Sequence, residues 1–268
     1  IVAHHCITLL GTGSSGGVPR VGGDWGVCDP ENPYNRRRRC SALVDRISSD
    51  GQMTRVLIDT SPDMREQLLD NDVKHLDALI YTHDHADQTH GIDDVRALVL
   101  AMRKPIPTYM DAATRESLTH RFNYCFVGRG GYPAILDLQD DMTLDQPLII
   151  EGLGGAIEFL PLDQEHGGIR SLAFRIGDVA YCNDVSNIPP ETMAQLRGLD
   201  TFIVDALRYT PHPTHAHLER VMEWVEELTP QQTILTNLHV DMDYETLRGE
   251  LPSSVIPAYD NMKITFEA

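Results

Sequence analysis

The sequence predicts one large α/β domain spanning residues 1–268, and two observations support this prediction. The chain is long for an average domain but ordinary for a single α/β domain, and its 41% hydrophobic residues can form a sizeable core. Short apolar runs of strand length alternate with helix-start signals, as in layered α/β folds. No repeat of solenoid spacing is visible, and no low-complexity linker divides the chain.

The first half of the chain alternates expected strands with expected helices. The strands are apolar or alternating runs at residues 7–10, 41–44, 55–59 and 105–109, with a further run that begins at Leu79. The helices are expected from the N-cap Ser61 and Pro62 to about residue 71, over residues 93–100, and from about Ala112. Glycines and aromatic residues at 123–135 predict a mobile loop, either a lid over the substrate or an ordinary surface excursion.

The second half continues the alternation. Strands are expected at residues 157–162 and 201–205, in a hairpin of residues 171–176 and 179–182, and at residues 233–238. An amphipathic helix is expected over residues 218–228. Polar residues follow several of these strands, where a rigid scaffold can present them to one point.

The densest group of such residues follows the run that begins at Leu79. Three histidines and two aspartates lie within eight residues, at positions 83–90. Alternate residues of an extended segment share one side, so His83, His85 and Asp87 can face the same metal ion. Imidazole nitrogen and carboxylate oxygen suit zinc and its neighbours. This spacing predicts a metal site.

The segment Thr82–Asp87 resembles the His-x-His-x-Asp-His signature of the metallo-β-lactamase superfamily. The glycine-rich segment Gly11–Pro19 is similar to the opening of one branch, which holds the tRNA 3′-processing endonucleases and the phosphoribosyl cyclic phosphodiesterases of the carbon–phosphorus lyase pathway. The resemblance is closest to the cyclic phosphodiesterases and covers nearly the whole chain. It implies a four-layer αββα sandwich built from β-α halves of residues 1–150 and 151–268.

The resemblance also implies the ligands of a first metal. His166 closes a strand and matches the family's isolated third histidine, so His83, His85 and His166 are expected to hold this ion. Asp184 matches the aspartate that bridges to a second ion. Asp59 occupies the position of an acid that supports the ligands from behind.

The second metal position departs from the family pattern. Gln88 stands where the family has histidine, and a neutral amide oxygen is a weaker ligand than imidazole. Asn237 stands where the family has another histidine, but His239 lies on the same side of an extended segment. Asp87, His239 and Gln88 are therefore expected to complete a remodelled second position. The cofactor is expected to be one or two divalent ions, zinc first and manganese second.

Three histidines precede the helix at 218, and they can be metal ligands, proton-transfer groups or bystanders. The Thr-His-x-x-Leu pattern aligns His215 with the family's catalytic histidine, and Asp87 is counted with it as catalytic. His215 is expected to protonate the departing oxygen, a task for a group that titrates near pH 7. His217 is expected to support it, and His212 is expected to be exposed.

Substrate contacts are expected from two loops. The glycine-rich loop can offer backbone N–H groups to an anion, which points to Ser14, Ser15 and Gly16, or it is a plain turn between strands. The run Arg36–Arg39 is either a solvated loop tethered by salt bridges or a phosphate-recognition element. Arg39 and His217 complete the predicted substrate contacts.

Bulk properties limit the partners. The net charge of −18 disfavours a long nucleic acid but not a small phosphate ester. Five cysteines at scattered spacings indicate reduced thiols, hence a cytoplasmic protein, and Cys28 and Cys40 alone do not reproduce the family's structural zinc cluster. No membrane span or secretory signal is expected. The oligomeric state stays open, a homodimer included.

The predicted function is that of a metal-dependent phosphodiesterase. Two divalent ions would lower the pKa of a shared water, and the resulting hydroxide would hydrolyse a small cyclic phosphate or nucleotide-like phosphodiester. One alternative is a tRNA 3′-processing endonuclease, although its extended basic arm is missing from this sequence. Thioester or lactam hydrolysis uses the same scaffold. The non-enzymatic alternative is a nucleotide-binding or metal-sensing module with a degraded second metal site.

Overall fold

The computed structural model describes residues 2–268 and divides the chain into two compact units. Unit 1 comprises residues 2–10, 41–159 and 263–268. Unit 2 comprises residues 11–40 and 160–262. The division therefore differs from the expected halves, because it falls at residue 160 inside a strand and assigns the glycine- and arginine-rich segment 11–40 to unit 2.

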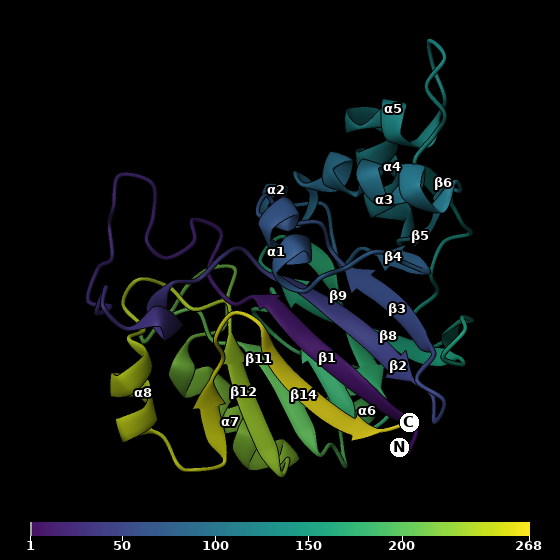
Figure 1. Cartoon of the computed structure of the whole chain (residues 1–268). Helices are drawn as coiled ribbons and strands as arrows, with labels where there is room; N and C mark the ends of the chain where they lie inside the picture. Colours follow the sequence, from purple (N-terminus) through teal and green to yellow (C-terminus); the bar gives the residue numbers. More distant parts are fainter. Residues whose placement is uncertain (1) are drawn as a thin grey trace. The chain divides into compact units, whose positions relative to one another are not determined.

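Unit 1 is built on a seven-stranded mixed sheet (Figure 1). In spatial order its strands are β14 (Met262–Glu267), β1 (His4–Gly11), β2 (Ser41–Ile47), β3 (Met53–Ile58), β4 (Ala78–Ile80), β5 (Ile106–Tyr109) and β6 (Leu136–Leu138). The β2–β3 pair is antiparallel, whereas β3 to β6 are parallel neighbours. Because Ile58 pairs with Ile80, the segments that follow β3 and β4 begin at the same edge of the sheet.

Helices cover this sheet through one apolar cluster. They are α1 (Met64–Asp70), α2 (Ala86–Thr89), the 3₁₀ helix η2 (Ile92–Val95), α3 (Arg96–Met102), α4 (Ala112–Arg121) and α5 (Asn123–Phe126). Leu57 and Leu79 from the strands pack in the same cluster as Leu68, Val99 and Leu118 from the helices. Each such side chain contributes about 1.5–3 kcal/mol when fully buried.

Unit 2 holds most of a second mixed sheet. Its strands in spatial order are β13 (Val255–Pro257), β12 (Gln232–Thr236), β11 (Thr201–Asp205), β10 (Val179–Cys182), β9 (Ile169–Ile176), β8 (Ile157–His166) and β7 (Leu148–Ile150). Strands β10 to β13 are parallel, and β8 and β10 both run antiparallel to β9. The carboxyl ends of β8, β10, β11 and β12 therefore lie at the same edge.

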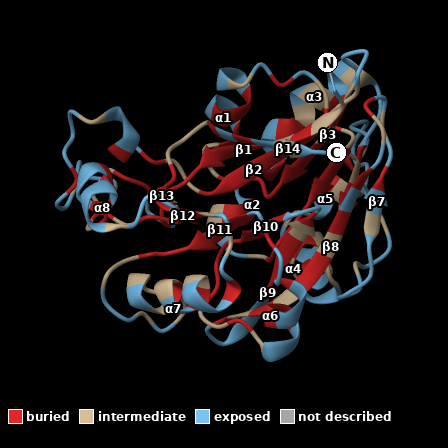
Figure 2. Ribbon diagram, turned by 90° about the horizontal axis from the view of Figure 1, so that it is seen from below, coloured by how far each residue is buried: buried red, intermediate tan, exposed pale blue. Residues whose placement is uncertain are grey.

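Three helices and a short 3₁₀ turn complete unit 2: α6 (Pro190–Gln195), α7 (Leu218–Leu228), α8 (Tyr244–Glu250) and η1 (Pro33–Asn35). Val221 and Trp224 on α7 share an apolar cluster with Phe202 and Leu235 on the central strands. Figure 2 shows the buried residues concentrated on the strands and on one side of the helices. The amphipathic helix expected at 218–228 is confirmed.

Two mixed sheets flanked by helices confirm the predicted α/β class. Each sheet forms one β layer and its helices form one α layer, as in an αββα fold. Helix α1 begins later than expected, at Met64, because Ser61 closes a preceding turn in which its Oγ accepts from Asp63 N at 3.1 Å. Residues 123–135 are more ordered than a plain loop, since they include α5.

All five cysteines are free thiols. Among the described residues, no helix combines the length and apolar character that crossing a membrane requires.

Candidate metal centre

The histidine-rich segment of unit 1 starts where β4 ends. His83 is buried and His85 is exposed, and their ring centroids lie 4.7 Å apart. Thr82 links them to the end of β3: its hydroxyl donates to Asp59 Oδ2 at 2.7 Å and contacts His83 Nδ1 at 2.9 Å. A hydroxyl has one proton to donate, so it accepts from His83 Nδ1–H. This leaves Nε2 of His83 as the nitrogen for a ligand.

Asp59 supports this segment from a strained backbone position. Its φ is +63°, in the left-handed region, and its side chain is fully buried. Burial raises the pKa of the Asp59 carboxyl to about 8, although hydrogen bonds from Thr82 N and Thr82 Oγ1 oppose the shift. The carboxyl thus orients His83 through Thr82, the supporting role that the resemblance implied for Asp59.

Asp87 does not continue the extended row of His83 and His85, so that expectation is wrong. Helix α2 begins at Ala86, and Asp87 lies in its first turn. Gln88 is buried, and its amide nitrogen donates to Asp87 Oδ2 at 3.1 Å. In this arrangement Gln88 holds the Asp87 carboxylate. A direct ligand role for either residue stays a prediction.

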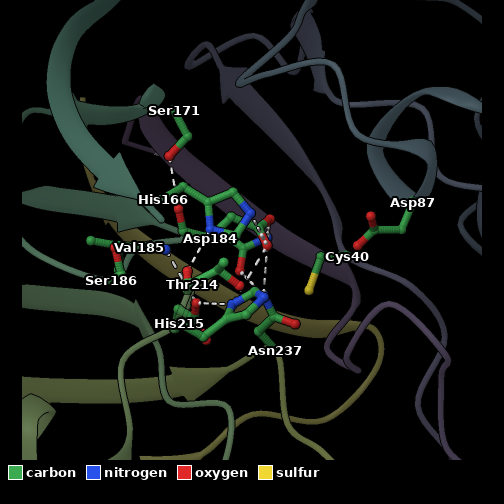
Figure 3. Close-up of polar contacts among 12 residues, drawn as sticks. Cys40, Asp87, His166, Ser171, Asp184, Val185, Ser186, Thr214, His215 and Asn237 are labelled. Carbon is green, nitrogen blue, oxygen red and sulfur yellow. Dashed lines mark hydrogen bonds and ion pairs between the residues drawn. The ribbon is translucent and has the colours of Figure 1, made fainter. Parts of the chain in front are cut away.

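Unit 2 brings a second group of ligand atoms together at the carboxyl ends of its strands. His166 is the last residue of β8, Asp184 follows β10, and His215 precedes α7. One ligand atom of each lies within 4.8 Å of the ligand atoms of the other two. Figure 3 shows the two imidazoles on either side of the carboxylate. The structure thus groups His215, expected as a proton donor, with two expected metal ligands.

Hydrogen bonds fix which nitrogen each of these histidines presents. His166 Nδ1 donates to the Thr214 carbonyl at 2.6 Å, so its Nε2 faces Asp184 Oδ1 at 3.8 Å. His215 Nδ1 lies 2.6 Å from Asp205 Oδ2 and 3.8 Å from Asp184 Oδ1. A carboxylate bound to Nδ1–H holds the ring and favours its charged form.

The sequence prediction missed Asp205. It is the last residue of β11, is completely buried, and also accepts from Val185 N at 3.1 Å. The sequence does contain a sign of it, because Asp205 is an acid at the end of a buried strand, as are Asp59 and Asp184. Asp205 is the residue that orients His215.

Two amides hold the Asp184 carboxylate. Asn237 Nδ2 donates to Asp184 Oδ1 at 3.1 Å, and Asn183 Nδ2 donates to Asp184 Oδ2 at 3.0 Å. Asp184 and Asn237 both have left-handed φ values, +51° and +60°. Such strain is common at functional sites. Asn237 occupies a position where the family has histidine. Here it holds the Asp184 carboxylate by a hydrogen bond, the supporting role expected for it, and is not itself one of the clustered ligand residues.

The remaining histidines of unit 2 lie around this group. The Nδ1 of His239 lies 3.0 Å from Asp241 Oδ1, and His239 is not among the three clustered ligands of unit 2. Its role as a substitute ligand stays a prediction. His212 was expected to be exposed but is partly buried, with its ring centroid 5.2 Å from that of His215. Burial and the nearby His215 lower the pKa of His212. His217 is the N-cap residue of α7, and its substrate role is still a prediction.

The glycine-rich loop is tied down by its own backbone. Gly13 N, Ser14 N and Gly17 N donate to the carbonyls of Arg38, Leu238 and Ser14, so these amides are engaged within unit 2. Ser15 and Gly16 are exposed at the tip. The amides of Gly13, Ser14 and Gly17 thus have partners within unit 2, and the substrate contacts expected of Ser14, Ser15 and Gly16 stay predictions.

The arginine run has mainly structural contacts. Arg37 is 2% exposed, and its guanidinium donates to the His239 carbonyl at 3.4 Å and to Asn35 Oδ1 at 3.3 Å. Arg38 pairs with the half-buried Asp260 at 3.3 Å. Arg39 is partly buried, and its phosphate-binding role is untested.

The donor atoms fit a divalent cation of the zinc type. In unit 2, two imidazoles and a carboxylate with fixed orientations meet within 4.8 Å, and His166 and Asp184 are buried. Unit 1 adds an imidazole whose Nδ1 is engaged, as in metal-binding histidines.

Comparisons with known proteins agree with this chemistry. The fold and the site define a metal-dependent hydrolase. The chain belongs to the beta-lactamase superfamily, whose domain model matches residues 54–237. It is related to the PhnP family: a structure described as a new diphosphatase from that family is 36% identical, with a TM-score of 0.86, covering 98% of this chain and 97% of that one.

Other similarities are more distant or partial. An octanoyltransferase of Porphyromonas gingivalis (strain ATCC BAA-308 / W83) is 31% identical over 262 residues, which are 96% of this chain but 51% of that protein. The chain thus spans about half the length of this curated relative. Zn²⁺-bound PqqB from Methylobacterium extorquens is 16% identical, covers 97% of this chain and 99% of that chain, and has a TM-score of 0.73, which shows the shared fold.

Proposed function

We propose that the chain hydrolyses a small cyclic phosphate or nucleotide-like phosphodiester, with His83, His85, His166 and Asp184 as metal ligands. The observation that carries this proposal is the group of His166, Asp184 and His215 backed by the buried Asp205. It offers metal ligands and an oriented proton donor together. This ligand set rests on the family pattern of His83, His85, His166 and Asp184, with zinc before manganese as its metal.

The residues divide the chemistry between them. Bound divalent cations would activate water and neutralise the phosphate oxygens. His215, with Nδ1–H bound to Asp205, carries its second proton on Nε2 and gives it to the departing oxygen as the P–O bond breaks. The water would release one proton to solvent and its hydroxyl would be joined to phosphorus, while the imidazole is left neutral. Asp205 stabilises the charged imidazole before this transfer.

Support for a phosphate-ester substrate comes from the PhnP-family diphosphatase, which is similar over its whole length. The net charge of −18 disfavours a long polyanion, and cations in the site would invert the field for a small ester. Ser14, Ser15, Gly16, Arg39 and His217 are the proposed substrate contacts. Cytoplasmic location is part of the same proposal.

The test is hydrolysis of nucleoside 2′,3′-cyclic phosphates and of a nucleoside diphosphate ester by protein loaded with zinc or manganese. We expect turnover that His166→Ala and Asp184→Ala reduce at least about 100-fold. The matched control is His120→Ala, because His120 is an exposed residue of α4. Equal turnover by the control and both ligand variants would remove the proposal.

A second candidate is hydrolysis of an acyl thioester, and the observation that favours it is the octanoyltransferase relative. This chain matches about half of that protein, so the part of the octanoyltransferase outside the match is a second place for the octanoyl-transfer activity. Octanoyl thioesters in the same assay separate the two candidates. Preference for the thioester over every phosphate ester would favour the second candidate.

A further inference from the structure

A pocket in unit 1 has a composition that suits a ligand of different chemistry from a metal. Its volume is about 320 Å³, and it is lined by Arg96, Tyr124, Arg129 and Tyr132. Two arginines and two tyrosines thus meet in one pocket of a chain whose net charge is −18. They come from α3, α5 and the segment that follows α5 (Figure 1).

The last two residues are placed by a tight turn. Arg129 N donates to Tyr132 O at 2.9 Å, and Tyr132 N donates to Arg129 O at 3.0 Å. Between them, Gly130 and Gly131 have φ values of +61° and +86°, which glycine adopts at little cost. Residues that exchange both backbone hydrogen bonds project their side chains to the same side. The sequence Arg-Gly-Gly-Tyr therefore pairs a guanidinium with a phenol ring.

The charges of the pocket leave one cation available. Arg96 is paired with Asp93 at 2.7 Å and lies over the Tyr124 ring at 5.9 Å. The Arg129 side chain has no hydrogen bond or ion pair with any other residue that the structure describes. Tyr124 is 48% exposed and Tyr132 is 72% exposed, so both rings are accessible.

The chain leading into α5 contacts the histidine segment within unit 1. Arg121, at the end of α4, donates to the Asp84 carbonyl and lies 3.9 Å from the Asp84 carboxylate. The next residue, Phe122, has its ring centroid 6.1 Å from that of His90. Helix α5, which carries Tyr124, begins directly after it. The segment that lines the pocket thus starts against the loop that carries His83 and His85.

From this arrangement we infer that the pocket binds a ligand with an aromatic ring and one phosphate group, as in the base and distal phosphate of a nucleotide-like substrate. The residues of this subsite are Arg96, Tyr124, Arg129 and Tyr132. The inference rests on the proposed function for the reaction, but the pocket itself is defined by unit 1 alone. Tyrosine faces stack on a nucleobase, and a free guanidinium pairs with a single phosphate.

Binding is tested with adenosine 5′-monophosphate, adenosine and ribose 5-phosphate by calorimetric titration. We expect Tyr132→Ala to weaken binding of the monophosphate by about 5- to 150-fold, the range for one lost base stack, while Tyr132→Phe restores it. Arg129→Ala should weaken binding of the monophosphate more than that of adenosine. Arg65→Ala is the matched control, since Arg65 is an exposed arginine of α1. Wild-type affinity in Tyr132→Ala overturns the inference.

Kinetics decide whether the ligand is the substrate or a separate effector. We expect Tyr132→Ala to lower the ratio of kcat/KM for a nucleoside cyclic phosphate to kcat/KM for a base-free ribose cyclic phosphate by the same factor of about 5 to 150. Monophosphate binding with an unchanged ratio would overturn the assignment to the substrate. Absence of turnover on both esters contradicts the proposed function, and the calorimetric titrations then decide on the pocket alone.

Discussion

Replacement of Asp205 by asparagine tests the proton-transfer role of His215. Asparagine has nearly the same shape as aspartate and can still accept from Val185 N. The change removes the negative charge that lies 2.6 Å from His215 Nδ1. The protonated imidazole therefore loses its stabilising partner, while the packing around this buried position is retained.

The expected size of the effect follows from that contact. A positioned general acid contributes about 10²- to 10⁴-fold to a rate, and loss of its orienting carboxylate removes part of this. We expect Asp205→Asn to lower kcat about 100-fold, equivalent to about 2.7 kcal/mol. His215→Ala should lower it about 1,000-fold. Because both residues act through one proton transfer, the double variant should match His215→Ala.

The assay is steady-state hydrolysis of a nucleoside cyclic phosphate by the wild type, the two single variants and the double variant. Asp178→Asn serves as the control, because Asp178 is an exposed acid in the β9–β10 turn. Thermal unfolding of each variant separates loss of activity from loss of structure. The reasoning is refuted if Asp205→Asn retains activity within threefold of the wild type, or if the two effects multiply.

Three further predictions concern packing, pH and support of the metal ligands. Gly91→Ala should lower the free energy of unfolding, measured with urea, by about 3 kcal/mol, because a Cβ there would lie 1.9 Å from the Ser61 carbonyl oxygen. The control is Gly168→Ala, because nothing lies within 4 Å of a Cβ at that position. A loss of stability no larger than that of the control would contradict the prediction. Burial raises the pKa of Asp260 to about 6, so the folded state binds the extra proton and stability should fall by up to about 3 kcal/mol as pH rises from about 4 to 6. Asp260→Asn should abolish this slope in urea unfolding, and an unchanged slope would show that another group causes it. Asn237→Ala should weaken zinc binding about tenfold in a chelator-competition assay, since Asn237 holds the Asp184 carboxylate; wild-type affinity would contradict the supporting role.

The sequence predicted those parts of the site that depend on local spacing. His83 and His85 follow a buried strand, and His166 closes another, so their positions could be read from apolar runs that end in polar residues. Asp87 was misplaced because the extended segment was assumed to continue, whereas the backbone turns into α2 at Ala86. Alternation along a strand does not reveal where the strand gives way to a helix.

Contacts between residues far apart in the sequence were not predictable. Asp205 accepts from Val185 N because β10 and β11 are parallel neighbours, a pairing that the pattern of one strand does not specify. Arg37 is buried against the His239 carbonyl, although the run of four arginines gave no sign that one of them faces inward. The composition of residues 123–135 predicts only a loop, whereas the Gly-Gly turn between Arg129 and Tyr132 determines the geometry of these two residues.

The central proposal is that His83, His85 and His166, the histidines of the family pattern, are ligands of one metal ion. Zinc titration of the metal-free protein, followed by calorimetry, tests it with His83→Ala from unit 1, His166→Ala from unit 2 and the exposed control His120→Ala. We expect the first two substitutions to weaken the same binding event by more than about 100-fold and the control to leave it unchanged. A wild-type protein that binds no zinc, or a His83→Ala variant that keeps the wild-type affinity, would contradict the claim.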